Sequence, residues 1–114
     1  MPNEPQLDLV FKALSDSTRR KILIQLGNKG LAVGELSEQF DISKPAVTKH
    51  LNVLENAGLL RRVVKGKQRI CFAEPDMLKD AEQWLEFYLQ FWNDRLDGLK
   101  DFLESDSDTE HRHK

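Results

Sequence analysis

Apolar side chains repeat at helical spacing over three stretches of the first 40 residues. Those of residues 7–14 recur at steps of three and four and predict one face of a first helix. Asp16 or Ser17 can accept hydrogen bonds from the free N–H groups of a second helix, over residues 18–26. After a turn, residues 33–40 place two apolar side chains four residues apart and predict a third helix.

The sharpest boundary in the pattern lies at residues 43–45. Ser43 is a good N-cap, and Pro45 falls in the first helical turn, where a missing backbone N–H costs nothing. A fourth helix therefore begins here and runs to about Ala57, followed by Gly58, the residue type best suited to the left-handed conformation after a helix end. Two helices joined by about three residues, the second opening on a cap, predict a helix-turn-helix.

A hairpin is predicted directly after these helices, over residues 59–73. Two stretches rich in Val, Ile, Leu and Phe, residues 59–64 and 69–73, flank four residues in which Gly66 permits a tight reversal. The expected fold class is therefore mainly α with a small β-hairpin, arranged as a winged helix-turn-helix.

Helical spacing returns after Pro75 and continues over residues 76–104. The apolar positions that carry this spacing or widen the stripe are Leu78, Ala81, Trp84, Leu85, Phe87, Tyr88, Phe91, Trp92, Leu96, Leu99, Phe102 and Leu103. Residues 1–6 and 105–114 lack such a repeat. We therefore expect one domain over residues 7–104, between a flexible leader and a disordered tail.

Composition fits this single domain, since the 114 residues are 39% hydrophobic and 32% charged. No apolar run approaches the roughly 20 residues of a membrane span, and the first residues are too short and polar for a signal peptide. The single cysteine, Cys71, cannot form an internal disulfide. These features predict a cytoplasmic protein. Because the sequence contains no glycine-rich phosphate loop and no nucleophile paired with a histidine, we expect neither an enzyme nor a cofactor.

Charge is distributed unevenly along the chain, although the formal net charge is only −2. Residues 43–69 are rich in lysine and arginine and contain Glu55 as their single glutamate, whereas acidic residues predominate from Glu74 onward. A partner meets one face of a protein at a time, so a basic middle segment lets an acidic protein bind nucleic acid. Two ordinary solvated surfaces would give the same pattern, so charge alone does not decide between the two readings.

The helix predicted at residues 43–57 presents short polar and cationic side chains opposite its apolar face. Small residues allow close approach to the major groove, hydroxyl and amide groups meet base edges, and lysines meet phosphates. An ordinary surface helix is also polar outside, but here a basic hairpin follows at once, and the combination favours DNA. The predicted DNA contacts are Arg19, Arg20, Ser43, Lys44, Pro45, Ala46, Thr48, Lys49, His50, Arg62, Lys65, Lys67 and Arg69.

Four runs of residues, together with Leu54, carry a family resemblance: ALSDSTRRKIL at residues 13–23, VGEL at residues 33–36, SKPAVTKHL at residues 43–51 and AGLL at residues 57–60. They resemble the ArsR/SmtB family of bacterial repressors, and the similarity extends over residues 7–104. It implies a homodimeric winged helix-turn-helix transcriptional repressor that binds an imperfect DNA palindrome.

The chain departs from that family at the metal sites. Ala32 and Gly34 stand where metal-sensing members carry cysteines, and residues 76–104, which match a second site built from Asp and His, contain no histidine. Borderline metals need thiolate or imidazole donors, so the resemblance implies a subgroup that lacks both sites. His111 and His113 form a poor site on a disordered tail, and we expect no bound metal.

Cys71 allows two interpretations. A thiol beside Arg69 would have a lowered pKa and could act as a redox switch. Its apolar neighbours Ile70 and Phe72 favour a structural cysteine in a strand instead, and one thiol cannot make an intramolecular switch.

The last helix is too apolar to pack by a single stripe on one small domain. Across a two-fold axis the same helix covers itself, and the first helix can join it, so we predict that the first and last helices form a dimer interface. Its predicted residues are Leu7, Val10, Phe11, Trp84, Phe87, Tyr88, Phe91, Trp92, Leu96 and Leu99. The core of a monomer and a hydrophobic ligand pocket between paired helices stay open as alternatives.

These patterns together favour a sequence-specific, DNA-binding transcriptional regulator, expected to be a dimeric repressor with double-stranded DNA as its partner. The alternative is a winged-helix interaction module that binds a protein through the aromatic last helix without reading DNA. Release from DNA by a small apolar ligand, by a partner protein or by no ligand at all stays open, as do the operator sequence and activation in place of repression.

Overall fold

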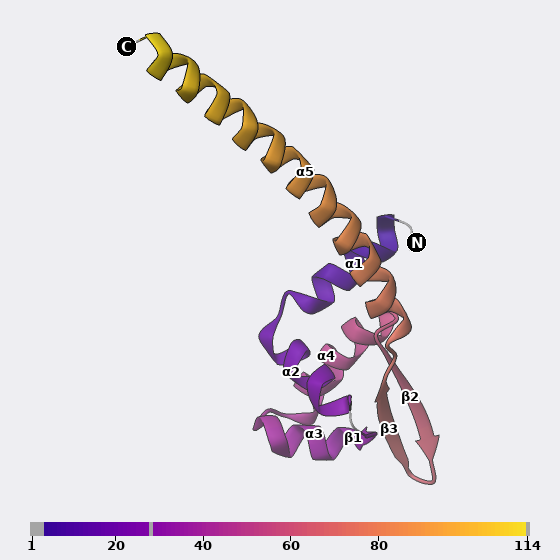
Figure 1. Cartoon of the computed structure of the whole chain (residues 1–114). Helices are drawn as coiled ribbons and strands as arrows, with labels where there is room; N and C mark the ends of the chain where they lie inside the picture. The colour runs from indigo at the N-terminus through magenta and orange to yellow at the C-terminus, as the bar shows by residue number, and fades with distance from the viewer. Residues whose placement is uncertain (1–3, 28, 114) are drawn as a thin grey trace. The chain divides into compact units, whose positions relative to one another are not determined.

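The structure is a computed structural model that describes residues 4–27 and 29–113, with side chains described up to Ser105 (Figure 1). Its elements are α1 (Glu4–Leu14), α2 (Ser17–Leu26), β1 (Leu31–Ala32), α3 (Val33–Phe40), α4 (Lys44–Asn56), β2 (Leu60–Lys65), β3 (Gln68–Ala73) and α5 (Asp76–His113). The predicted fold class, mainly α with a small hairpin, is confirmed. The chain divides into two compact units after Ala81. We call the residues up to Ala81 the body, and α5 from Glu82 onward the distal helix.

Two helices of the body, α2 and α4, begin at predicted caps, and of the two candidates for α2 the cap is Asp16. The Asp16 carboxylate accepts two backbone N–H groups in the first turn of α2, at 2.8 and 3.2 Å. The Ser43 hydroxyl accepts the N–H of Ala46 at 3.2 Å, and Pro45 lies in the first turn of α4. Gly58 follows α4 with a φ of +77°, in the left-handed region, as predicted. The helix expected at residues 43–57 is therefore confirmed as α4, with Ser43 and Ala57 as its caps.

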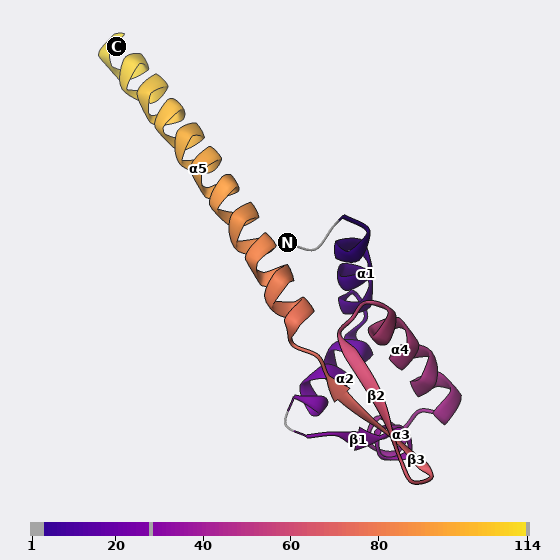
Figure 2. The same ribbon diagram turned by 90° about the vertical axis from the view of Figure 1, so that its right-hand side faces the viewer.

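The hairpin is confirmed and belongs to a three-stranded antiparallel sheet of order β1-β3-β2. β2 and β3 pair from Leu60 opposite Ala73 to Lys65 opposite Gln68, which leaves a two-residue loop. Gly66 opens that loop with a φ of +61°, as the first position of a type II′ turn requires. The two residues of β1 add a third strand against β3, beside which they lie in Figure 2. The sequence did not predict β1, because two residues are too short for a periodicity.

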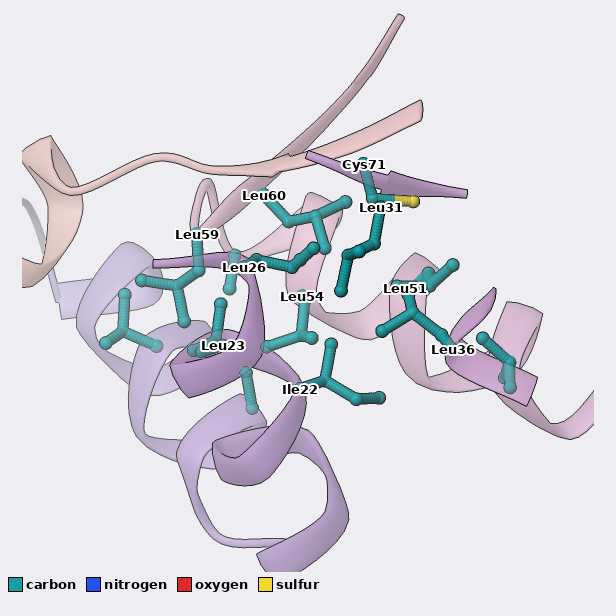
Figure 3. Packing of buried hydrophobic residues seen from close by; sticks show 14 of the residues in the cluster. Ile22, Leu23, Leu26, Leu31, Leu36, Leu51, Leu54, Leu59, Leu60 and Cys71 are labelled. Carbon is teal, nitrogen blue, oxygen red and sulfur yellow. The ribbon is translucent and has the colours of Figure 1, made fainter. Parts of the chain in front are cut away.

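The core of the body lies between the helices and the sheet (Figure 3). Ile22, Leu23 and Leu26 enter it from α2, and Leu51 and Leu54 enter it from α4. Further apolar side chains come from α1, α3 and the sheet, and the first turns of α5 add Met77, Leu78 and Ala81. Ile22, Leu36, Leu51 and Leu54 have no exposed surface. Burial of this kind contributes about 1.5–3 kcal/mol for each large apolar side chain and holds α4 against the rest of the body.

The helical region is longer at both ends than the predicted domain of residues 7–104. α1 begins at Glu4, inside the expected leader, and places Pro5 in its first turn, where proline is tolerated. α5 continues to His113, through the residues expected to form a disordered tail. A helix that is already nucleated extends by one hydrogen bond for each added residue, without needing an apolar side chain.

Candidate nucleic-acid interface

The outward face of α4 combines exposed cations with short polar side chains. Lys44, Pro45, Lys49 and Asn52 are exposed, whereas Ala46, Thr48 and His50 are half-buried. The opposite face is fully buried through Val47, Leu51 and Leu54. The helix is thus fixed by its apolar side while its hydroxyl, amide and ammonium groups stay available to a partner.

The side chains of Arg19 and Arg20 bind carbonyl oxygens at the end of α1. Both residues were predicted to contact phosphates. The guanidinium of Arg19 donates to two carbonyl oxygens in the last turn of α1, at 2.7 and 2.9 Å, and its Nη1 lies 3.4 Å from His50 Nδ1 on α4. Arg20 donates to a third carbonyl of that turn at 2.7 Å. The N–H of Arg19 also bonds to Asp16 and holds the pKa of that carboxyl below its ordinary value. Arg19 therefore connects α1, α2 and α4.

Arg62 lies on β2 and reaches α4. Its Nε and Nη2 donate to the two carboxylate oxygens of Glu55 at 3.1 and 2.8 Å, and Nη2 also donates to Asn52 Oδ1 at 2.7 Å. The hydrogen bonds from Arg62 lower the pKa of Glu55, and the carboxylate raises the pKa of Arg62. Arg62 was predicted as a direct DNA contact, whereas here its charge is matched by Glu55.

The tip of the hairpin carries the remaining predicted cations. Lys65, Lys67 and Arg69 are exposed and surround the turn at Gly66. Lys65 and Arg69 lie on the paired strands, Lys65 opposite Gln68 at the last rung of the ladder, and Lys67 lies in the two-residue loop. Exposed cations in this arrangement have the chemistry to meet the phosphates of a duplex.

Arg61, also on β2, was not among the predicted contacts. Its guanidinium forms an ion pair with Glu74 and lies 4.9 Å from the centre of the Phe72 ring. Alternation along a strand sends Arg61 and Arg62 to opposite faces, so only Arg62 reaches α4. That alternation is a signal by which the sequence could have separated the two arginines.

An open hollow of about 390 Å³ adjoins the start of α4 and the start of β3. It is lined by Ala32, Val33, Gly34, Glu35, Glu38, Lys44, Gln68 and Arg69. Ala32 and Gly34, the positions that the family resemblance assigns to thiolate ligands, thus offer it no side-chain donor. Among the described side chains, no group of three or more His, Cys, Asp or Glu could hold a metal ion. The side chains of His111 and His113 lie outside the described residues.

Cys71 lies on β3 with no exposed surface. Burial raises the pKa of its thiol, which is opposite to the lowering that a reactive switch requires. The structural interpretation of this cysteine fits the structure better than the redox one.

The distal helix exposes most of its large apolar side chains. Phe87 is 65% exposed and Trp92 44%, and the aromatic rings touch one another along the helix, as where Trp84 stacks on Tyr88 at 4.9 Å. Of the residues predicted for a dimer interface on the first helix, Leu7 and Val10 are buried within the chain and Phe11 is half-buried. The side chains of Leu7 and Val10 therefore have almost no surface left to offer a partner. No helix among the described residues is long and apolar enough to span a membrane.

Comparison with known proteins gives the same picture of the body. Residues 14–63 match a helix-turn-helix domain family. The chain is 36% identical over 101 residues to the HTH-type transcriptional regulator Rv2034 of Mycobacterium tuberculosis, covering 89% of this chain and 92% of that protein. It is 40% identical over 76 residues to the transcriptional repressor SdpR of Bacillus subtilis, covering 67% of this chain and 84% of SdpR.

A solved structure extends the similarity to the fold. An ArsR-like transcriptional regulator from Rhodococcus sp. RHA1 superimposes with a TM-score of 0.81 at 35% identity, covering 89% of this chain and 93% of that one. The predicted family and the predicted class of function are confirmed by these relatives, which are transcriptional regulators. With α4 as recognition helix and β2-β3 as wing, the chain belongs to the ArsR family of DNA-binding, winged helix-turn-helix transcriptional regulators.

Proposed function

We propose that this regulator acts as a cytoplasmic, homodimeric repressor that reads an imperfect palindrome in double-stranded DNA. The observation that carries the proposal is that the polar face of α4 and the basic tip of the hairpin are both exposed, with Lys44 and Arg69 lining the same hollow. A helix of this kind fits the major groove, and a wing of this kind meets the backbone or the minor groove. The similarity to SdpR, a transcriptional repressor, supports repression over activation.

The proposed groove contacts are those side chains of α4 that are not used to hold the body together. Lys44, Thr48 and Lys49 would meet bases and nearby phosphates, with Pro45 and Ala46 allowing close approach. Ser43 and the wing residues Lys65, Lys67 and Arg69 would meet the backbone. Arg19 has a different proposed role, because its donors already bind α1: it would hold His50 at the edge of the groove surface.

The distal helix is the proposed dimer interface. Its exposed aromatic and aliphatic side chains include Phe91 and Trp92, and apolar surface of this extent on a small protein marks an interaction site. A second copy is the partner that supplies an equally apolar and self-complementary helix. Two recognition helices held about 34 Å apart would then read successive major grooves on one face of the duplex.

Selection of bound duplexes from random DNA at fixed salt tests the reading function. We expect a palindromic sequence with half-sites one helical turn apart. Thr48→Ala should relax one position of that sequence, whereas Lys67→Ala should weaken all duplexes equally and reduce the salt slope by about one. Lys29→Ala, which removes one exposed charge between α2 and β1, is the matched control and should leave binding unchanged. A flat selection would refute DNA reading and leave the protein-interaction module as the better description.

Sedimentation tests the dimer. We expect the unaltered chain to be a dimer at micromolar concentration, and the double change Phe91→Ala and Trp92→Ala to weaken association by at least about 10-fold. Ile24→Ala removes an apolar side chain that is 70% exposed on the body and serves as control. Equal association of all three proteins would exclude the distal helix as the interface. A promoter fusion carrying the selected site then distinguishes repression from activation.

A further inference from the structure

Arg62 binds two residues of the recognition helix that lie one turn apart. Its Nε and Nη2 each donate a hydrogen bond to the Glu55 carboxylate, and Nη2 donates a third hydrogen bond to Asn52 Oδ1 at 2.7 Å. The Arg62 side chain is only 15% exposed, so this cluster is held rather than loosely solvated. Asn52 itself is exposed on the outward face of α4, beside the proposed groove contacts.

The chemistry of the guanidinium determines which way the Asn52 amide points. A guanidinium only donates hydrogen bonds, so the atom of Asn52 that faces it must be the oxygen. The carbonyl oxygen is therefore turned toward β2, and the NH₂ group, with its two donors, is left for a partner of α4.

This orientation matters because asparagine normally reads adenine with both ends of its amide. The oxygen accepts from adenine N6 while the nitrogen donates to N7. Arg62 occupies one lone pair of the oxygen and holds the oxygen toward β2, so the NH₂ group is the end of the amide that faces a partner. Guanine is the base whose major-groove edge presents two neighbouring acceptors, O6 and N7. We propose that Arg62 is a specificity-determining positioning residue: it fixes Asn52 as a hydrogen-bond donor, so that the base opposite Asn52 is guanine and adenine is disfavoured.

Glu55 has to be separated from this effect in any test. Removing Arg62 alone would leave an unmatched carboxylate on the DNA-binding helix, and that charge would weaken binding to every duplex. The double change Arg62→Met and Glu55→Gln removes both members of the ion pair and keeps the net charge of the pair at zero. It releases the Asn52 amide without altering the electrostatics of the surface.

Selection from random DNA is the test, and the inference rests on the proposed reading function. We expect the unaltered protein to prefer guanine over adenine at one position of each half-site by about 5- to 10-fold. Asn52→Ala should abolish that preference at that position alone. Arg62→Met with Glu55→Gln should raise adenine there to parity or above, and adding Asn52→Ala to this pair should remove the gain.

The matched control lies on the same strand. Arg61→Met with Glu74→Gln removes an ion pair that makes no described contact with α4, so the selected sequence should stay unchanged. An unaltered base preference after Arg62→Met with Glu55→Gln would overturn the proposal, as would an adenine preference in the unaltered protein. Failure of the unaltered protein to select any sequence would instead refute the reading function itself.

A second measurement does not depend on the folding of an Arg62 variant. Replacing the selected guanine by 7-deazaguanine removes the N7 acceptor from the DNA. The unaltered protein should lose about 5-fold in affinity, whereas Asn52→Ala should lose nothing further. Equal losses in the two proteins would show that Asn52 does not donate to this base and would overturn the proposal.

Discussion

The body and the distal helix use the same kinds of apolar residue in opposite ways. In the body, Ile22, Leu51 and Leu54 have no exposed surface, and no polar side chain among the described residues of the chain is buried with them. In the distal helix, Leu96 is 54% exposed and Phe102 62%. The body therefore buries its core side chains among its own elements, whereas the distal helix leaves most of its large apolar side chains exposed. Stability and assembly should respond to mutations in different regions.

Leucine truncation should give the largest difference between the two regions. Leu54→Ala leaves a cavity in the core of the body and should lower the free energy of unfolding by about 2–5 kcal/mol. Leu99→Ala, on a side chain that is 53% exposed, should change it by less than about 0.5 kcal/mol at concentrations below those of self-association. Urea titration of both variants measures the two changes in the free energy of unfolding. Equal losses would mean that the distal helix belongs to the same cooperative core.

Replacing glycine by alanine should have opposite effects on stability in the two regions. Gly58 has a φ of +77°, and an added Cβ would lie 2.9 Å from Met77 Cγ, so Gly58→Ala should destabilise the body by about 1–3 kcal/mol. An added Cβ at Gly98 meets nothing within 4 Å, and Gly98→Ala should stabilise α5 by about 0.5–1 kcal/mol. Thermal unfolding compares the two at one protein concentration. Shifts of the same sign would contradict the assignment of these two backbone environments.

Arginine removal should separate a structural guanidinium from a surface one. Arg19→Ala removes the donor from two carbonyl oxygens at the end of α1 and should cost about 1–3 kcal/mol. Arg95 lies 4.7 Å from the centre of the exposed Phe91 ring, a contact that contributes about 0.5–1 kcal/mol at such a site. Arg19→Ala should therefore lower the free energy of unfolding more than Arg95→Ala does. Urea titration of the two variants tests this order. A smaller loss for Arg19→Ala would show that the end of α1 finds other donors.

The smallest expected effect is the pH dependence from Glu55. Its pKa in the folded chain is held below the ordinary value of 4.5, chiefly by hydrogen bonds from Arg62. A lowered carboxyl pKa contributes stability above the unfolded value, and this contribution is lost as pH falls through the folded value. Because the Glu55 side chain is 40% exposed, we expect about 0.5 kcal/mol or less. The free energy of unfolding should fall from pH 7 to pH 3.5 in the unaltered chain. In Glu55→Gln it should fall by about 0.5 kcal/mol less, or by a smaller margin. An unchanged difference would mean that the ion pair adds nothing to stability.

Much of this architecture follows from local sequence chemistry. The caps at Asp16 and Ser43, the helix end at Gly58 and the turn at Gly66 each depend on a few adjacent residues, and each was predicted correctly. The outward face of α4 also follows from its sequence, because helical periodicity separates the buried residues from the exposed ones.

What the sequence left undecided depends on residues that meet only after folding. β1 exists because β3 lies beside it, and two residues have no pattern of their own. Strand alternation places Arg61 and Arg62 on opposite faces, but it does not identify what either arginine binds. The partners of Arg19, Arg61 and Arg62 lie 6 to 31 positions away along the chain and meet them only after folding. The sequence by itself determined where helices, turn and basic wing occur, since these depend on neighbours in the chain. Tertiary structure alone decided which cations stay free for DNA, because an arginine next to carbonyls or a carboxylate is already bound.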